Sequence, residues 1–111
     1  MFKRIDTAFV YVSNMEASVN WYKEILGLKV ALDYPGYVSF KLGETYLTLI
    51  QNKDQINQKF STFNFFVDDA FATHQYLTEK FVEVTEIKSD GVDHFAFFDL
   101  DGNRLEICSF K

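Results

Sequence analysis

The second half of this chain repeats the strand–helix–strand–strand–strand pattern of its first half. The segment TAFVYVSN, which starts at Thr7, aligns with TFNFFVDD, which starts at Thr62, so the two copies are offset by 55 residues. In both copies an apolar, β-rich run leads into a capping residue and a helical pattern, and short strands follow. The 111 residues of the chain therefore predict one domain, 1–111, built from two βαβββ modules.

The first copy carries clear boundary signals. Ser13 or Asn14 is expected to cap a helix that ends at Gly27, because these residue types are typical at the two ends of helices. The strands are expected at 5–12, 29–34, 37–42 and 45–51. Module 1 is thus predicted to span 1–52, and the polar segment 53–59 is predicted to be a linker.

The second copy, predicted to span 60–111, has the same order. Asp68 or Asp69 is expected to cap a helix whose residues Phe71, Tyr76 and Leu77 face inward. The strands are expected at 60–67, 82–87, 93–100 and 104–110. The dipeptide Asp101-Gly102 predicts a hairpin between the last two strands.

Charge and cysteine content narrow the functional class. The net charge of −5 disfavours binding to nucleic acid or to an anionic membrane surface. The single cysteine excludes an internal disulfide and favours a reducing compartment. No apolar run approaches the length needed to cross a bilayer. We therefore expect a cytoplasmic protein without nucleic-acid or membrane partners.

Two motifs resemble the vicinal oxygen chelate superfamily, which contains glyoxalase I, extradiol dioxygenases, fosfomycin resistance enzymes and bleomycin resistance proteins. They are YVSNMEASVNWYKEILGL at 11–28 and FFDLDGNRLEI at 97–107, with Leu100 where the family usually has proline. The resemblance spans the chain and implies an α+β fold. In that fold two βαβββ modules form a curved mixed sheet around a concave cup, with helices on the convex side. It also implies a homodimer.

The resemblance places metal ligands at four strand positions, which here hold Thr7, Thr48, Thr62 and Glu106. Threonine hydroxyls are poor ligands for a divalent transition metal, and one carboxylate does not hold such an ion. His74 is expected on the exposed side of a helix and His94 near a turn, so neither replaces a lost ligand. We therefore predict no metal and no other cofactor.

Strand alternation predicts which residues line the cup. These ligand-binding candidates are Thr7, Phe9, Tyr11, Tyr46, Thr48, Thr62, Asn64, Phe66, Phe97 and Glu106, with Phe98 in place of Phe97 if the hairpin register differs. Glu106 has two competing interpretations: it contacts a ligand, or it is a remnant of the fold hydrogen-bonded to Thr7 or Thr62.

Neighbours of Glu106 have simpler interpretations. Cys108 is expected to be a small buried thiol without a histidine beside it. Arg104 is expected to be a solvated residue at the end of a strand. No cationic cluster suited to a phosphonate is expected.

Aromatic walls with a few polar partners are typical of small-molecule binding. The first hypothesis is therefore a metal-free binding protein that holds an apolar or aromatic ligand, with a cationic ligand and antibiotic sequestration as options. The alternative is a lyase, isomerase or dioxygenase that uses Glu106 as its sole catalytic candidate or a relocated metal site. A third possibility is an interaction module whose cup is filled by its own side chains.

Overall fold

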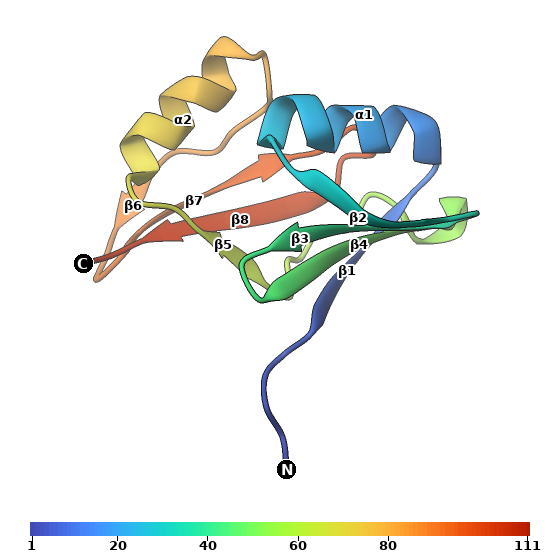
Figure 1. Cartoon of the computed structure of the whole chain (residues 1–111). Coiled ribbons are helices and arrows are strands. Elements are labelled where there is room, and N and C mark those ends of the chain that lie inside the picture. The colour runs from blue at the N-terminus through green and yellow to red at the C-terminus, as the bar shows by residue number, and fades with distance from the viewer. The chain divides into compact units, whose positions relative to one another are not determined.

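The computed structural model describes residues 1–111, which divide into two compact units, Met1–Ile56 and Asn57–Lys111 (Figure 1). Each unit is a βαβββ module with its own four-stranded mixed sheet, so the predicted α+β class and the two-module repeat are confirmed. The division falls within the segment 53–59. Part of that segment, Lys53–Gln55, forms a short 3-10 turn, η1.

Module 1 follows its predicted pattern closely. Its elements are β1 (Thr7–Val12), α1 (Met15–Leu26), β2 (Lys29–Tyr34), β3 (Tyr37–Leu42) and β4 (Thr45–Gln51). The strand order is β1-β4-β3-β2; β1 runs parallel to β4, and the other neighbours are antiparallel.

Helix α1 starts and stops where its caps predict. The side chain of Asn14 accepts a hydrogen bond from the Ala17 N–H, and Gly27 ends the helix in the left-handed conformation at φ 68°. On the packed side, the buried ring of Tyr22 stacks on Phe40 with 5.9 Å between centroids. Helix α1 therefore covers the face of the sheet that carries Phe40.

Module 2 has the same element order with shorter outer strands. Its elements are β5 (Asn64–Phe66), α2 (Ala70–Glu79), β6 (Lys88–Ser89), β7 (Asp93–Phe98) and β8 (Arg104–Ser109). The strand order is β5-β8-β7-β6, with β5 parallel to β8.

Two strands predicted for module 2 are wrong in extent. Only 64–66 of the predicted strand 60–67 is regular, and 82–87 makes a single isolated bridge, from Val84 to Phe97. Just before 82–87, Phe81 adopts a positive φ of 62° where the chain leaves α2. In addition, the Ala96 N–H donates to the Thr85 hydroxyl, so a side chain replaces a ladder partner.

Helix α2 is capped by Asp69, whose carboxylate accepts from the N–H groups of Phe71 and Ala72. Leu77 is buried as expected, but Phe71 and Tyr76 are exposed, so their predicted inward orientation is wrong. The packed stripe runs through Ala70, His74 and Leu77. The His74 ring lies against Phe95, so its expected position on the exposed side of the helix is wrong. Phe71 and Tyr76 are each offset by one residue from this stripe and point away from the sheet.

The predicted hairpin at Asp101-Gly102 joins β7 to β8. Asp99 organises it: its carboxylate accepts from the N–H groups of Asp101 and Asn103 and from the Asn103 side-chain amide, each at 3.0 Å. Gly102 has φ +74°, which suits glycine. The motif DLDGN is thus explained by turn formation.

Neither helix has the length and apolar character that a membrane span requires.

Candidate functional site

Each sheet has one face that its helix does not cover, which we call the open face. Because side chains alternate along strands, the registers assign residues to the open face of module 1. They are Thr7, Phe9, Tyr11, Tyr37, Ser39, Lys41, Tyr46, Thr48 and Ile50. Five predicted ligand-binding residues therefore share this face: Thr7, Phe9, Tyr11, Tyr46 and Thr48.

These residues differ in accessibility. The Phe9 side chain is 49% exposed, whereas Thr48 is fully buried. The hydroxyls of Thr48 and Ser39 lie 2.7 Å apart and form a hydrogen bond. The Thr7 hydroxyl donates to Asp6 at 2.8 Å. Thr48 thus offers no surface to a ligand in this structure, while Phe9 does.

Module 1 also carries a pocket of about 240 Å³, lined by Arg4, Lys41, Glu44 and Tyr46. Arg4 is held by an exposed ion pair with Asp6 at 3.1 Å. Sequence reasoning identified only Tyr46 among these four. The cross-strand pairing of Lys41 with Tyr46 depends on the register of β3 and β4, which becomes apparent only once the hairpin is placed.

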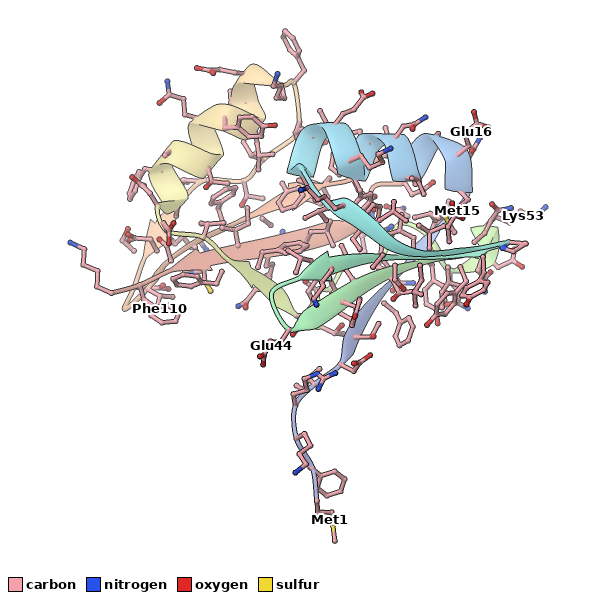
Figure 2. All side chains as sticks on the ribbon, in the orientation of Figure 1. Met1, Met15, Glu16, Glu44, Lys53 and Phe110 are labelled. Atoms are coloured by element: carbon pink, nitrogen blue, oxygen red, sulfur yellow. The ribbon has the colours of Figure 1, made fainter.

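The open face of module 2 holds the other predicted residues. It comprises Asn64, Phe66, His94, Ala96, Phe98, Arg104, Glu106 and Cys108. Asn64 lies directly opposite Glu106, and Phe66 lies opposite Cys108. Thr62 is exposed and precedes the strand. Beyond Cys108, the ring of Phe110, which is labelled in Figure 2, lies 4.9 Å from that of Phe66 between centroids.

The placement of Phe97 beside Glu106 is wrong. In the β7–β8 register Ala96 lies opposite Glu106, and Phe97 lies opposite Leu105 on the helix-covered face. Phe97 is only 1% exposed and contacts the ring of Phe65. The register therefore puts Phe98, which lies opposite Arg104, on the open face in its place.

Glu106 has an ionic partner rather than a threonine partner. One oxygen of its carboxylate lies 3.6 Å from a guanidinium nitrogen of Arg104, and both side chains are partly exposed. Arg104 begins β8 and is partly exposed, as expected for a solvated residue at the end of a strand, and it is also paired. This pair neutralises part of the charge of Glu106 toward a ligand.

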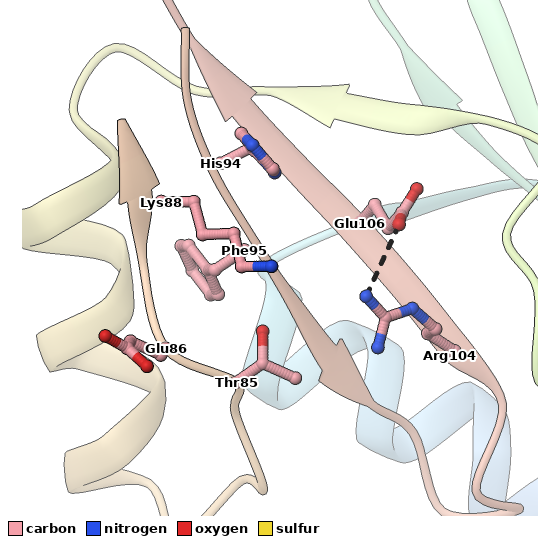
Figure 3. Close-up of a pocket in the computed structure, with 7 residues that line it drawn as sticks. All are labelled: Thr85, Glu86, Lys88, His94, Phe95, Arg104 and Glu106. Atoms are coloured by element: carbon pink, nitrogen blue, oxygen red, sulfur yellow. Dashed lines mark ion pairs between the residues drawn. The ribbon is translucent and has the colours of Figure 1, made fainter. Parts of the chain in front are cut away.

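A pocket of about 290 Å³ adjoins this ion pair (Figure 3). Its lining residues are Thr85, Glu86, Lys88, His94, Phe95, Arg104 and Glu106. Sequence reasoning identified only Glu106 as a member. Thr85 and Glu86 lie in the segment 82–87, which was expected to be a strand but is irregular, and Lys88 lies in β6. The spacing of apolar residues does not predict this path.

His94 is oriented by an acidic neighbour. Its Nε2 lies 2.6 Å from an Asp90 carboxylate oxygen, and this hydrogen bond, with the charge of His94, lowers the pKa of Asp90 below 3.8. Contrary to expectation, His94 also lies directly opposite Cys108 in the sheet. Cys108 itself is buried, as predicted.

The four positions at which related folds hold metal ligands do not suit a metal ion here. Thr48 is enclosed and bonded to Ser39, Thr7 is bonded to Asp6, and Glu106 is paired with Arg104. Nowhere in residues 1–111 do three or more His, Cys, Asp or Glu side chains form a group that could hold a metal. A neutral hydroxyl set with one carboxylate does not match the preferences of transition metals.

The two modules carry different residues at equivalent positions on their open faces. Phe9 lies opposite Thr48 in module 1, and Asn64, the counterpart of Phe9 at an offset of 55 residues, lies opposite Glu106 in module 2. Thr48 and Glu106 are thus equivalent. One is sealed in a hydroxyl pair, and the other is partly exposed and charged.

Comparison with known proteins places this geometry in context. The chain is 28% identical to the metallothiol transferase FosB of Staphylococcus epidermidis, over 96% of this chain and 84% of that protein. The antibiotic-binding protein TnmS3 from Streptomyces sp. CB03234 superposes with a TM-score of 0.86 at 23% identity, over 99% and 98% of the two chains. Lactoylglutathione lyase from Agrobacterium tumefaciens gives a TM-score of 0.79 at 20% identity, over 98% and 95%.

Both structural neighbours are too distant in sequence to show more than a common fold. The family model described as Glyoxalase/Bleomycin resistance protein/Dioxygenase superfamily matches residues 4–107, nearly the whole chain. Proteins of this superfamily bind small molecules. The chain belongs to the glyoxalase/bleomycin resistance protein/dioxygenase superfamily.

Proposed function

We propose that this protein binds an apolar or aromatic small molecule on the open faces of its sheets and does not convert it chemically. The observation that carries the proposal is the exposure of aromatic rings on these faces. Phe9 is 49% exposed in module 1, and Phe66 is 54% exposed in module 2. Large apolar side chains left in contact with water favour a ligand that removes them from it.

Polar groups beside these rings supply orientation. The exposed amide of Asn64 lies on β5, opposite Glu106 on the neighbouring strand β8. Tyr46 lines the pocket of module 1. A few fixed polar groups among apolar ones are typical of small-molecule sites. The cationic ligand that the sequence analysis gave as an option loses support, because Glu106 already pairs with Arg104.

One structural relative supports a binding function. TnmS3, which shares the fold, is an antibiotic-binding protein, so antibiotic sequestration is one form that the proposed function takes. The resemblance to this family also supports a homodimer, for which light scattering of the purified protein is the direct test.

The test is a thermal-shift screen against aromatic compounds and antibiotics, followed by calorimetry. We expect the hits to weaken about tenfold or more in Phe9→Ala or Phe66→Ala, because each loses a large contact area. Phe71→Ala is the matched control, since Phe71 is also 54% exposed but lies on α2, away from the open face. Equal weakening by Phe71→Ala, or no hit from the panel, would contradict the proposal.

The enzymatic alternative is favoured by one observation, the 28% identity to FosB, a metallothiol transferase. Titration of the purified protein with Mn²⁺, Zn²⁺, Ni²⁺ and Fe²⁺ separates the two functions. We expect no stoichiometric ion, because of the threonine donor set. An ion bound in stoichiometric amount that switches on turnover would replace the binding proposal.

A further inference from the structure

Three hydrogen-bond donors come together in the module 2 pocket. Lys88, Arg104 and Thr85 all line the space of about 290 Å³. Figure 3 shows the ammonium group of Lys88 and the guanidinium of Arg104 extending toward the same space from opposite sides. Two cations and a hydroxyl around one cavity form an arrangement that can hold an oxyanion.

These donors have capacity left for a ligand. Lys88 makes none of the ion pairs of the structure. Arg104 approaches Glu106 through one nitrogen at 3.6 Å, which leaves its other N–H groups available. The Thr85 hydroxyl accepts from the Ala96 N–H at 2.8 Å, so its own proton is free to be donated.

The acids of the pocket limit the charge of the ligand. Glu86 and Glu106 balance Lys88 and Arg104, so the lining has no net formal charge when His94 is neutral. The lining itself therefore has no excess of negative charge, and Asp90, which interacts with Lys88 from outside the lining, is hydrogen-bonded to His94. A single carboxylate can bridge Lys88 and Arg104 and form two charge-assisted hydrogen bonds.

We propose that the pocket lined by Lys88, Arg104 and Thr85 binds the carboxylate of an apolar or aromatic monoacid. The inference rests on the proposed binding function and names the ligand class at one of its sites. Phe98 lies opposite Arg104 on the same face, and the exposed Phe66 and Phe110 rings extend the apolar surface along β8. An acid with an aromatic tail matches both parts of this face.

The experiment compares three probes of one shape by calorimetry: hydrocinnamate, its neutral amide and the corresponding amine. We expect the carboxylate to bind about tenfold or more tightly than the amide, and the amine to bind more weakly than either. In Lys88→Met the preference for carboxylate over amide should shrink to about threefold or less. Lys80→Met, which removes an exposed lysine of module 2 outside the pocket, should leave the preference unchanged.

The outcomes separate this inference from the proposed function. Equal binding of carboxylate and amide, or tighter binding of the amine, would overturn the carboxylate site while leaving ligand binding intact. An unchanged preference in Lys88→Met would also overturn it. If none of the three probes binds, this inference fails, whereas the proposed function fails only if the wider panel is silent as well.

Discussion

The guanidinium of Arg104 lies 3.6 Å from the carboxylate of Glu106 on the open face of module 2. Both side chains are partly solvated, at 34% and 40% exposure, so water screens their attraction. The pair therefore belongs to the solvent-accessible surface on which we propose that a ligand binds, and it contributes little to holding the module together.

Glu106→Gln should accordingly change the free energy of unfolding by less than about 1 kcal/mol. The measurement is urea denaturation followed by circular dichroism, with Glu79→Gln on α2 as a control for the loss of one exposed acid. A loss above about 2 kcal/mol would show that Glu106 is structural and would weaken its assignment to a binding face.

The buried hydroxyl pair of module 1 predicts a non-additive result. Thr48→Val leaves the Ser39 hydroxyl buried without its partner and should destabilise the protein by about 1–2 kcal/mol. The double variant Ser39→Ala with Thr48→Val removes both polar groups and should cost less than the sum of the single changes. Additive losses in a denaturation cycle would mean that the two hydroxyls act independently.

Among substitutions of a single acidic residue, we expect the one at Asp99 to lower the free energy of unfolding most. Asp99→Ala removes the acceptor for two backbone N–H groups and for the Asn103 amide, and should cost about 2–4 kcal/mol. Asp68→Ala, at an exposed acid that does not cap α2, is the matched control and should change stability by less than about 0.5 kcal/mol. Similar melting temperatures for the two variants would contradict this role of Asp99.

Asp90 and His94 predict a specific acid titration. Hydrogen bonding to His94 lowers the pKa of Asp90 below its ordinary value in the folded state. The stabilisation from this hydrogen bond is therefore fully present above the ordinary pKa of an aspartate. It disappears as the pH falls through the lowered pKa. In NMR titrations the His94→Ala variant should return the pKa of Asp90 toward 3.8, whereas His74→Ala should not move it. An unchanged midpoint in His94→Ala would show that the pair does not form in solution.

Local signals predicted most of the fold. Asn14, Gly27 and Asp69 marked helix ends correctly, because caps are decided by a few adjacent residues. The alternation in 45–51 likewise defined β4 to the residue. Within 82–87 the Thr85 hydroxyl accepts a hydrogen bond from the Ala96 N–H, and residue alternation does not predict a side-chain bond of this kind.

The candidate site was less accessible to sequence reasoning. Alternation placed Phe9 and Glu106 on open faces, but the choice between Phe97 and Phe98 needed the hairpin register. Lys88 reaches the pocket from the two-residue strand β6, which lies outside the strand expected at 82–87, so its position could not be inferred from strand spacing. Hydroxyl burial at Thr48 depends on cross-strand packing, which is a tertiary property.

Equivalent positions of the two modules hold Thr48 and Glu106. Thr48 is buried in a hydroxyl pair, whereas Glu106 is partly exposed to solvent. The architecture therefore tolerates very different chemistry at that point, because neighbouring core residues such as Leu47 and Ile107 anchor the strands from the other side. Position 106 is consequently suited to redesign, because new side chains there should change the selectivity of the proposed binding surface while the rest of the domain stays as it is.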